Sequence, residues 1–264
     1  MTIVVNSPVA GIGFAGTGGV SLVYPTILAQ SAIPFILAGG TGGTGTQFTI
    51  SATGALSTLP TLPFTSGNAF VYMPTGITGL ASGWYYALIQ SATTAQLYTA
   101  TYTSGDPRLA VPASPVAPSG ITAGSYSQTT GSNIIAHQIT VPGGTMGPNG
   151  SFRYTELLSW SAATTQNIYQ TNFGALNLIS NGLAVNTPNT GIIGMTQSLF
   201  NVNSASRQVF NPFISDAANQ NTVSPTYGSL NTGADVTFDS RLQLGAASNF
   251  AMINALRLEV MYGA

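Results

Sequence analysis

The sequence predicts an all-β protein in which a smaller β-rich N-terminal domain precedes a C-terminal, eight-stranded antiparallel jelly-roll sandwich. Three observations predict this class: apolar and polar residues alternate along short segments, glycine and proline separate these segments, and helical periodicity is scarce. Short strands at regular spacing, with turn signals between them, are typical of sandwiches and barrels. The best helical candidate is residues 247–255, and that segment is short.

Alternation is clearest near the C-terminus. In residues 236–244 the apolar members share one face of the expected strand and the polar members share the other: Val236, Phe238, Leu242 and Leu244 against Thr237, Asp239, Arg241 and Gln243. The last segment repeats this pattern, with Leu256, Leu258, Val260 and Tyr262 opposite Arg257 and Glu259. Further strands are expected at residues 133–141, 151–160, 167–174, 176–180, 194–200 and 207–211, which gives about eight in total. Eight antiparallel strands suit a jelly roll.

The N-terminal part has its own β pattern. Residues 83–90 and 95–102 are rich in aromatic and β-branched residues, and the short polar segment SATT joins them. We therefore expect a hairpin over residues 83–102. Residues 48–60 and 69–76 are expected to form shorter strands that glycine and proline end.

Ionic residues are scarce and unevenly placed. Charged residues make up 4% of the chain, with no lysine, and the first of them is Asp106. The many aromatic residues before Asp106 argue against disorder, so this uncharged part is expected to fold. A neutral surface has no charge repulsion to oppose association. We expect residues 1–105 to form an anchoring and assembly domain that packs against copies of itself or a larger particle.

Proline marks the expected domain boundary. Residues 106–118 contain four prolines, which favour an extended, semi-rigid spacer. The predicted organisation is therefore an N-terminal domain over residues 1–105, a linker rich in proline, glycine and serine over 106–130, and the jelly-roll domain over 131–264.

Composition excludes several classes of function. Apolar runs such as residues 33–40 are interrupted well before the roughly 18 residues that a membrane helix needs, so no membrane span is expected. Five scattered arginines do not form the basic patch that nucleic-acid binding requires. Since the chain has no cysteine, disulfides and thiolate chemistry are also excluded.

The C-terminal segments resemble a known group of proteins. Three segments are similar to the C-terminal jelly-roll region of bacteriophage tail-fibre, head-fibre and related virion proteins: PGGTMGPNGSFRYTELLSWS at 142–161, NIYQTNFGALNLI at 167–179, and ADVTFDSRLQLGAASNFAMINALRLEVMY at 234–262. The likeness covers about the last 130 residues, with the MGPNG turn as its most specific part. Residues 83–107 more weakly resemble an N-terminal piece that accompanies this region. The resemblance implies a virion component, commonly trimeric, and it provides no catalytic residues.

Two glycine-rich motifs invite a nucleotide-binding interpretation. Residues 11–16, GIGFAG, fit the dinucleotide pattern, but no helix is expected after them and no acidic residue precedes Asp106 to hold a ribose. Residues 39–46, GGTGGTGT, resemble a phosphate loop in composition only, because the chain has no lysine. We interpret both as loops, the second suited to a close contact between subunits.

The chain offers few groups for catalysis or metal binding. His137 is the only histidine and lies in phase with Ile135, Ile139 and Val141, which predicts a partly buried strand residue rather than a catalytic base. Six dispersed acids, one histidine and no cysteine make a poor ligand set for a metal.

Carboxylate spacing also argues against a glycosidase. Asp235 and Asp239 are about 13 Å apart along an extended strand, which is too far for a hydrolytic pair. Glu156 lies in phase with Phe152 and Trp160, so it is expected to point inward and to pair with an arginine. A glycoside hydrolase acting through Glu156 or Asp239 is the least favoured interpretation.

Together these observations predict a non-enzymatic structural component of a bacteriophage virion, assembled in the host cytoplasm as a tail fibre, head fibre or capsid decoration. The N-terminal half would attach to the particle and the jelly roll would be exposed for host-surface binding. No catalytic, cofactor-binding or metal-binding residue is assigned, and no receptor-binding residue is identified. The expected partners are further copies of the chain, with a trimer favoured, other capsid or tail proteins, and a host-surface glycan as a candidate. The alternative is a carbohydrate-binding module or adhesin outside any virus.

Overall fold

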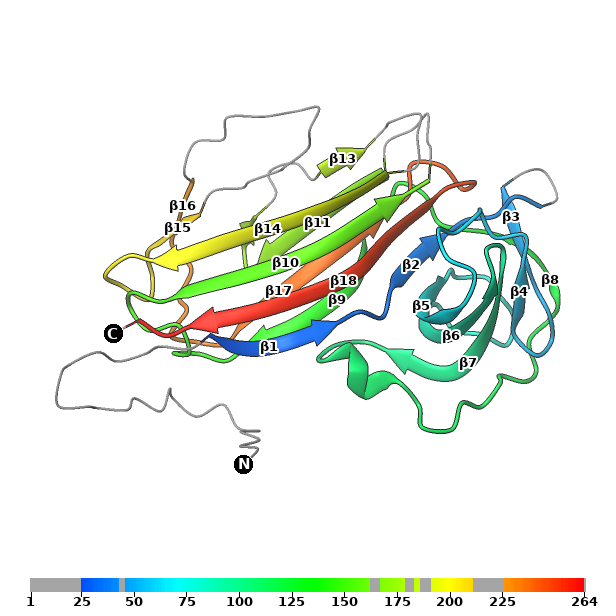
Figure 1. The fold of residues 1–264 in the computed structure, drawn as a ribbon, viewed down its shortest axis with the longest axis horizontal. Coiled ribbons are helices and arrows are strands. Elements are labelled where there is room, and N and C mark those ends of the chain that lie inside the picture. The colour runs from blue at the N-terminus through cyan, green and yellow to red at the C-terminus, as the bar shows by residue number, and fades with distance from the viewer. Residues whose placement is uncertain are drawn as a thin grey trace.

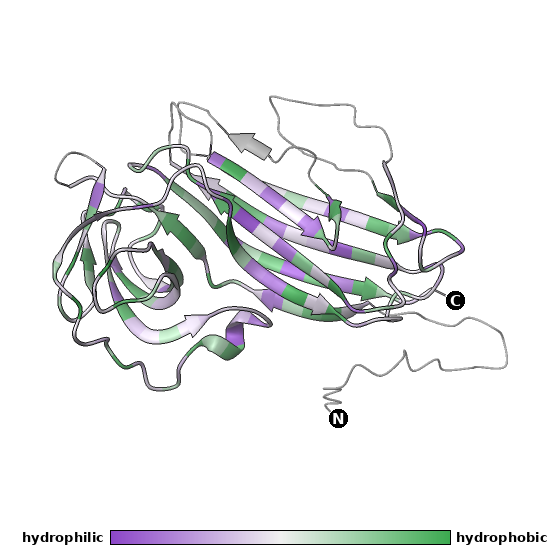
Figure 2. Ribbon diagram, turned by 180° about the vertical axis from the view of Figure 1, so that it is seen from behind, coloured by the Kyte–Doolittle hydropathy of each residue, from purple (hydrophilic) through white to green (hydrophobic). Residues whose placement is uncertain are grey.

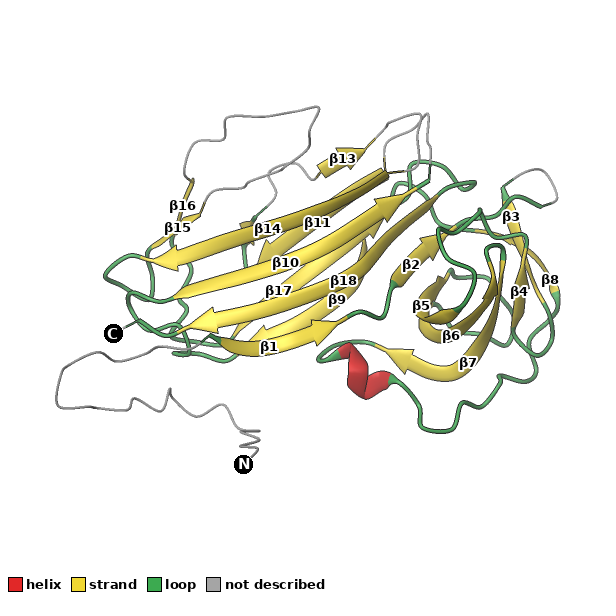
Figure 3. Ribbon diagram, viewed as in Figure 1, coloured by secondary structure: helices red, strands yellow, loops and turns green. Residues whose placement is uncertain are grey.

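The structure is a computed structural model that describes residues 25–42, 46–161, 167–178, 183–185, 191–210 and 226–263. Within these residues the chain is all-β, and the only helical element is one 3-10 turn, η1 (Pro107–Ala110) (Figure 3). The all-β prediction is confirmed. The helical candidate at 247–255 is wrong, because Phe250–Met261 forms a strand that is paired on both edges.

The strands follow in chain order. The first eight are β1 (Thr26–Ser31), β2 (Phe35–Ala38), β3 (Gln47–Ile50), β4 (Ala55–Ser57), β5 (Gly67–Met73), β6 (Gly83–Ser91), β7 (Thr94–Tyr102) and β8 (Gly124–Ser127). The others are β9 (Ile134–Val141), β10 (Ser151–Trp160), β11 (Asn167–Phe173), β12 (Leu176–Asn177), β13 (Leu183–Val185), β14 (Gly191–Asn201), β15 (Gln208–Phe210), β16 (Thr226–Gly228), β17 (Val236–Gln243) and β18 (Phe250–Met261). The described part of 131–264 thus holds ten strands rather than eight, since several are only two or three residues long.

These strands form two sheets (Figure 1). The large sheet has 13 strands in the order β16-β15-β14-β10-β18-β2-β5-β6-β7-β4-β3-β8, with β1 also paired to β18. The small sheet has five strands in the order β12-β11-β17-β9, with β13 also paired to β11. The described pairings are antiparallel except that of β2 with β5. The predicted hairpin over residues 83–102 is confirmed as β6 and β7.

The small sheet packs against the half of the large sheet formed by β14, β10, β18 and β1. Between them lies the sandwich core, in which Phe152 stacks on Phe173 at 4.7 Å between ring centroids and contacts Phe238 at 5.4 Å. Hydropathy alternates along these strands (Figure 2). The predicted apolar face of β17 is confirmed, because Val236, Phe238 and Leu242 are buried, but the opposite face is not fully solvated, since Asp239 is also buried. This face-to-face packing makes the C-terminal part a two-layered β structure.

A second core lies in the N-terminal part, and three strands separate it from the sandwich core. On β2, Phe35 and Leu37 face the sandwich core, whereas Ile36 and Ala38 face the N-terminal core. Strands β5 and β6 alternate in the same way, with Phe70 on the sandwich side. Both faces of this sheet segment are therefore buried, which explains why β2 is apolar at all four positions.

Strand β18 joins the two regions. Its first half, Phe250–Ile253, pairs with β2, and its second half, from Leu256 to Val260, pairs with β1 on the same edge. The sheet therefore continues from the expected N-terminal domain into the C-terminal one. Residues 106–130, the expected linker, contain η1 and also β8, which pairs with β3.

The glycine motif at 39–46 is described only in part, because residues 43–45 lie outside the described ranges. Gly39 donates its N–H to Asn249 O at 2.8 Å, and a Cβ on Gly39 would lie 1.6 Å from Ala247 O. Glycine is needed here because the backbone before β18 passes so close. The observed close contact is therefore within the chain, while the GIGFAG motif at 11–16 lies outside the described residues.

Candidate functional site

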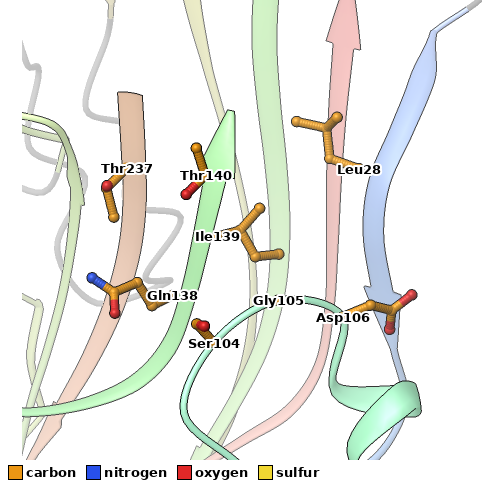
Figure 4. Close-up of a pocket in the computed structure, with 8 residues that line it drawn as sticks. All are labelled: Leu28, Ser104, Gly105, Asp106, Gln138, Ile139, Thr140 and Thr237. Atoms are coloured by element: carbon orange, nitrogen blue, oxygen red, sulfur yellow. The ribbon is translucent and has the colours of Figure 1, made fainter. Parts of the chain in front are cut away.

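A pocket of about 490 Å³ opens where the two regions meet at the edge of the small sheet. It is lined by residues 104–106 after β7, residues 138–140 of β9, Leu28 of β1 and Thr237 of β17 (Figure 4). These segments are far apart in the sequence. The pocket therefore exists only when β9, β1 and the loop after β7 are packed together.

Three hydrogen bonds hold the pocket loop against β9. Gly105 donates its N–H to Gln138 O at 2.8 Å, and the Tyr102 hydroxyl donates to Gly105 O at 3.1 Å. The Gln138 N–H in turn donates to the Tyr102 hydroxyl at 3.3 Å. Gly105 has a φ of 89°, a conformation that favours glycine. Burial raises the pKa of Tyr102, so its hydroxyl stays protonated and available for these bonds.

Asp106 begins η1 and forms one wall of the pocket. Its carboxylate accepts from the backbone N–H of Arg108 at 3.0 Å and from the Arg108 Nε at the same distance. These bonds to Arg108 outweigh the effect of burial and lower the pKa of Asp106. The carboxylate is therefore ionised at neutral pH, and the adjacent guanidinium balances its charge.

His137 lies behind the pocket in an aromatic enclosure. Its ring stacks on Tyr102 at 5.8 Å and meets Phe35 edge-on at 5.9 Å. The side chain is fully buried, and neither ring nitrogen has a hydrogen-bond partner within the described part of the chain. Burial lowers the pKa of His137 to about 3, so the ring is neutral at ordinary pH.

His137 lies in phase with the buried Ile139 and Val141, as predicted, but it is fully rather than partly buried, and Ile135 does not share its face. The pairing of β9 with β17 shifts register between Ser240 and Arg241, so Ala136 and His137 are both buried whereas Ile135 is 38% exposed. A bulge of this kind reverses the facing of residues on either side of it. The expectation that His137 is not a catalytic base stays a prediction, and its enclosure separates it from solvent.

Glu156 is buried in the sandwich core, as its phase predicts. The Ser240 hydroxyl donates a hydrogen bond to its carboxyl group, while its Oε1 has no partner among the described residues. Burial raises the pKa of Glu156 to about 7. Ser240 on β17 is also the residue opposite His137 on β9. The same serine therefore neighbours the two buried ionisable side chains, Glu156 and His137.

The predicted arginine partner of Glu156 is wrong. Arg153 and Arg257 both pair with Glu259 on the outer face of the large sheet. They occupy strand positions of the opposite parity from Glu156 and therefore point away from the sandwich core. A carboxyl group whose pKa is raised by burial is protonated over much of the pH range, so it does not require a cation.

The two aspartates considered as a hydrolytic pair have separate structural partners. Asp235 accepts the N–H of Gly143 at 2.8 Å, whereas Asp239 accepts from Arg241 Nε at 2.6 Å and from Asn172 at 2.9 Å. Asp239 is largely buried by these neighbours. The structure therefore does not bring the two carboxylates together as an acid and a base on a shared substrate site.

The described residues give no other concentration of reactive groups. Among them no three histidine, cysteine or acidic side chains lie close enough together to hold a metal ion. A helix of the length and hydropathy that a bilayer crossing requires does not occur in the described ranges either.

Sequence patterns missed most of the pocket. Asp106 had a local signal, since an acidic residue before Pro107 and Arg108 is typical of a helix start. The sequence gives no comparable signal for Gln138, Thr140 and Thr237, apart from their position among the polar residues of an expected strand. Only long-range packing brings them beside Asp106.

Comparison of the chain with protein-family models, with curated proteins and with solved structures finds no match. Its function is therefore inferred from the residues and their geometry. The pocket is lined by hydroxyl and amide groups, whereas His137 and Glu156 are enclosed.

Proposed function

We propose that the chain is a non-enzymatic structural component of a bacteriophage virion, namely a tail fibre, a head fibre or a capsid decoration. In this proposal the N-terminal part attaches to the particle, and the C-terminal two-layered structure is a jelly roll exposed for host-surface binding. The chain works as an oligomer, with a homotrimer favoured. The resemblance of the segments 142–161, 167–179 and 234–262 to phage fibre proteins is the source of the viral assignment.

One observation carries the proposal: the described residues before Asp106 fold without a single ionic side chain. Strands β2 to β7 belong to this part, and so do most residues of the N-terminal core, which Ile121, Phe250 and Met252 complete. Soluble proteins usually keep charge on their surfaces, and a surface without it associates readily. A subunit that is covered by neighbours in a particle has no need of that charge.

The outer face of the large sheet supports self-association. Phe200 and Met261 both pair with Ser151, so the two side chains share this face, and they are 49% and 40% exposed. Ile192, at the other end of β14, is 65% exposed. Neighbouring exposed apolar side chains such as Phe200 and Met261 are a feature of interaction surfaces.

Solution mass tests the oligomer. Light scattering is expected to give the mass of three chains of 27.0 kDa each. Phe200→Ser combined with Ile192→Ser should shift the protein to smaller species. The control is Leu109→Ser, because Leu109 is 86% exposed but lies on η1, away from that face. A wild-type monomer at high concentration would contradict the oligomer.

Electron microscopy of purified particles tests the virion assignment. Labelled antibody against the chain should decorate the head or the tail, and denaturing gels of washed particles should contain the polypeptide. Absence of the chain from particles whose host produces it would overturn the assignment.

The second candidate is a carbohydrate-binding module or adhesin outside any virus. The observation that favours it is the polar pocket, because two-layered β proteins also serve as lectins. A monomeric chain that binds glycans and is absent from particles would support this candidate.

A further inference from the structure

We propose that the pocket between residues 104–106 and β9 binds a neutral, hydroxyl-rich ligand of the size of one or two sugar units. The volume of about 490 Å³ lies within the range of about 300–1,000 Å³ that small-molecule sites occupy. The inference stands on the pocket alone, and it holds whether or not the chain belongs to a virion.

The polar lining matches hydroxyl groups. Ser104, Thr140 and Thr237 contribute hydroxyls and Gln138 contributes an amide, all of which both donate and accept hydrogen bonds. A sugar hydroxyl has the same dual capacity. Gln138, Thr140 and Thr237 lie together on one side of β9 in Figure 4. Successive hydroxyls of a sugar ring can therefore be bound from one surface.

The lining also has an aliphatic part. Leu28 and Ile139 lie between β9 and β1 in Figure 4, and Leu28 is the more exposed of the two, since Ile139 is only 5% exposed. A sugar ring carries C–H groups beside its hydroxyls, and burying them against aliphatic side chains is favourable. A site with both kinds of wall suits a ligand that is polar at its edge and apolar on its face.

The charges at the site favour a neutral ligand. Asp106 contributes a carboxylate, which accepts hydrogen bonds from the Nε and Nη2 groups of Arg108. Among the described residues, no cationic side chain lines the pocket. An anionic ligand would therefore be repelled by the Asp106 carboxylate and would find no positive charge to compensate. A carboxylate held in this way accepts hydrogen bonds from hydroxyls and does not require a cationic ligand.

An extended peptide fits the pocket poorly. A strand added to the free edge of β9 would bind the outward backbone groups of Gln138. Both groups are already used, because the N–H donates to Tyr102 and the carbonyl accepts from Gly105. The same bonds hold the pocket in shape before a ligand arrives, which reduces the entropy lost on binding.

Saturation-transfer NMR on the full chain provides the test, with the methyl glycosides of glucose, galactose, mannose and N-acetylglucosamine as probes. At least one glycoside should bind, with Kd in the millimolar range or below. Thr140→Val and Thr237→Val remove one hydroxyl each while keeping the shape of the side chain, so each should weaken binding about fivefold. Thr196→Val is the matched control, because Thr196 is exposed on β14 and bonds to Thr155 instead.

The outcomes are distinct. Failure of all four glycosides to bind, or binding that the two pocket variants leave unchanged, overturns the inference. Equal or tighter binding of glucuronate than of methyl glucoside overturns the neutral character of the ligand. Glycoside binding by a chain that is absent from phage particles would refute the virion proposal and leave this inference intact.

Discussion

The two cores of this protein are built from the same kind of strand but contain different groups. The N-terminal core contains no acid and no histidine among the described residues, and a buried polar side chain beside it, Gln128, is neutral and donates to Ala38 O and Tyr72 O. In the sandwich core, Glu156 and His137 are fully buried with unpartnered polar atoms. The difference teaches that a chain poor in charge does not exclude ionisable groups from its interior. Burial shifts the pKa values of both Glu156 and His137, so we expect their protonation to affect the free energy of unfolding.

The two cores are connected through shared strands. Strands β2, β5 and β6 contribute alternate residues to both cores, so loss of one core exposes one face of the other. The predicted division into domains at residues 1–105 and 131–264 stays a prediction about folding units.

Phe35→Ala is expected to have the largest effect. Phe35 is fully buried and packs against Phe70, Trp84 and Tyr102, with centroid distances from 4.9 to 5.4 Å. Its removal should lower the free energy of unfolding by about 3–5 kcal/mol. Urea unfolding of the wild type and of the variant measures this difference.

The same experiment tests the independence of the cores. The chain has two tryptophans, Trp84 on β6 and Trp160 on β10. In each single-tryptophan background, Trp84→Phe or Trp160→Phe, the fluorescence midpoint should coincide with the circular-dichroism midpoint of the same variant, and Phe35→Ala should lower both together. Fluorescence and circular-dichroism midpoints that differ within one variant would show that the shared strands do not couple the regions.

Glu156→Gln is expected to change the pH dependence of stability. The folded pKa of about 7 lies above the ordinary value of 4.5. The folded state therefore holds this proton more tightly, and the stability from it is complete below about pH 4.5 and lost as pH rises through 7. At pH 8 the variant should be more stable than the wild type by about 3 kcal/mol, with little difference at pH 4.5.

Thermal or urea unfolding across pH measures this effect. Ile50→Val in the N-terminal core is the control, and its cost of about 1 kcal/mol should not depend on pH. If the stability difference between Glu156→Gln and the wild type were the same at every pH, the raised pKa of Glu156 would be refuted.

His137→Phe should flatten the acid side of the profile. The folded pKa of about 3 lies below the ordinary value of 6.5, so the unfolded state binds the proton more tightly between these values. Stability is complete above about pH 6.5 and falls with pH towards 3. The wild type should lose about 2 kcal/mol from this group between pH 7 and pH 5, and the variant should not.

NMR gives a direct check on His137. It is the only histidine, so its ring resonances are unambiguous. They should not titrate in the folded protein above about pH 4. Titration near pH 6.5 would contradict the enclosure by Phe35 and Tyr102.

Arg153→Met is expected to have the smallest effect. The Arg153 side chain is 51% exposed where it pairs with Glu259, and Arg257 pairs with the same carboxylate. Solvent screens such a pair, and Glu259 keeps a second partner, so the loss should be less than about 1 kcal/mol. Urea unfolding at low and high salt measures it, and a loss of several kcal/mol at both would show that this ion cluster stabilises the fold as strongly as a core residue.

Local pattern determined the features that depend on one segment at a time. The period of two along β17 predicts which side chains are buried, and the aromatic and β-branched runs of β6 and β7 predict their hairpin. The same parity places Glu156 inside. These features are fixed by the direction of side chains along an extended backbone, which the sequence states residue by residue.

The tertiary structure decided everything that needs two distant segments. The pairing of β2 with β18, the bulge that turns Ile135 outward, Ser240 rather than an arginine beside Glu156, and the pocket between Gly105 and Gln138 have no local signal. Periodicity tells which face of a strand is buried but not which strand lies across from it. Register and sheet order depend on the packing of the whole chain, and with them the position of every group in the candidate site.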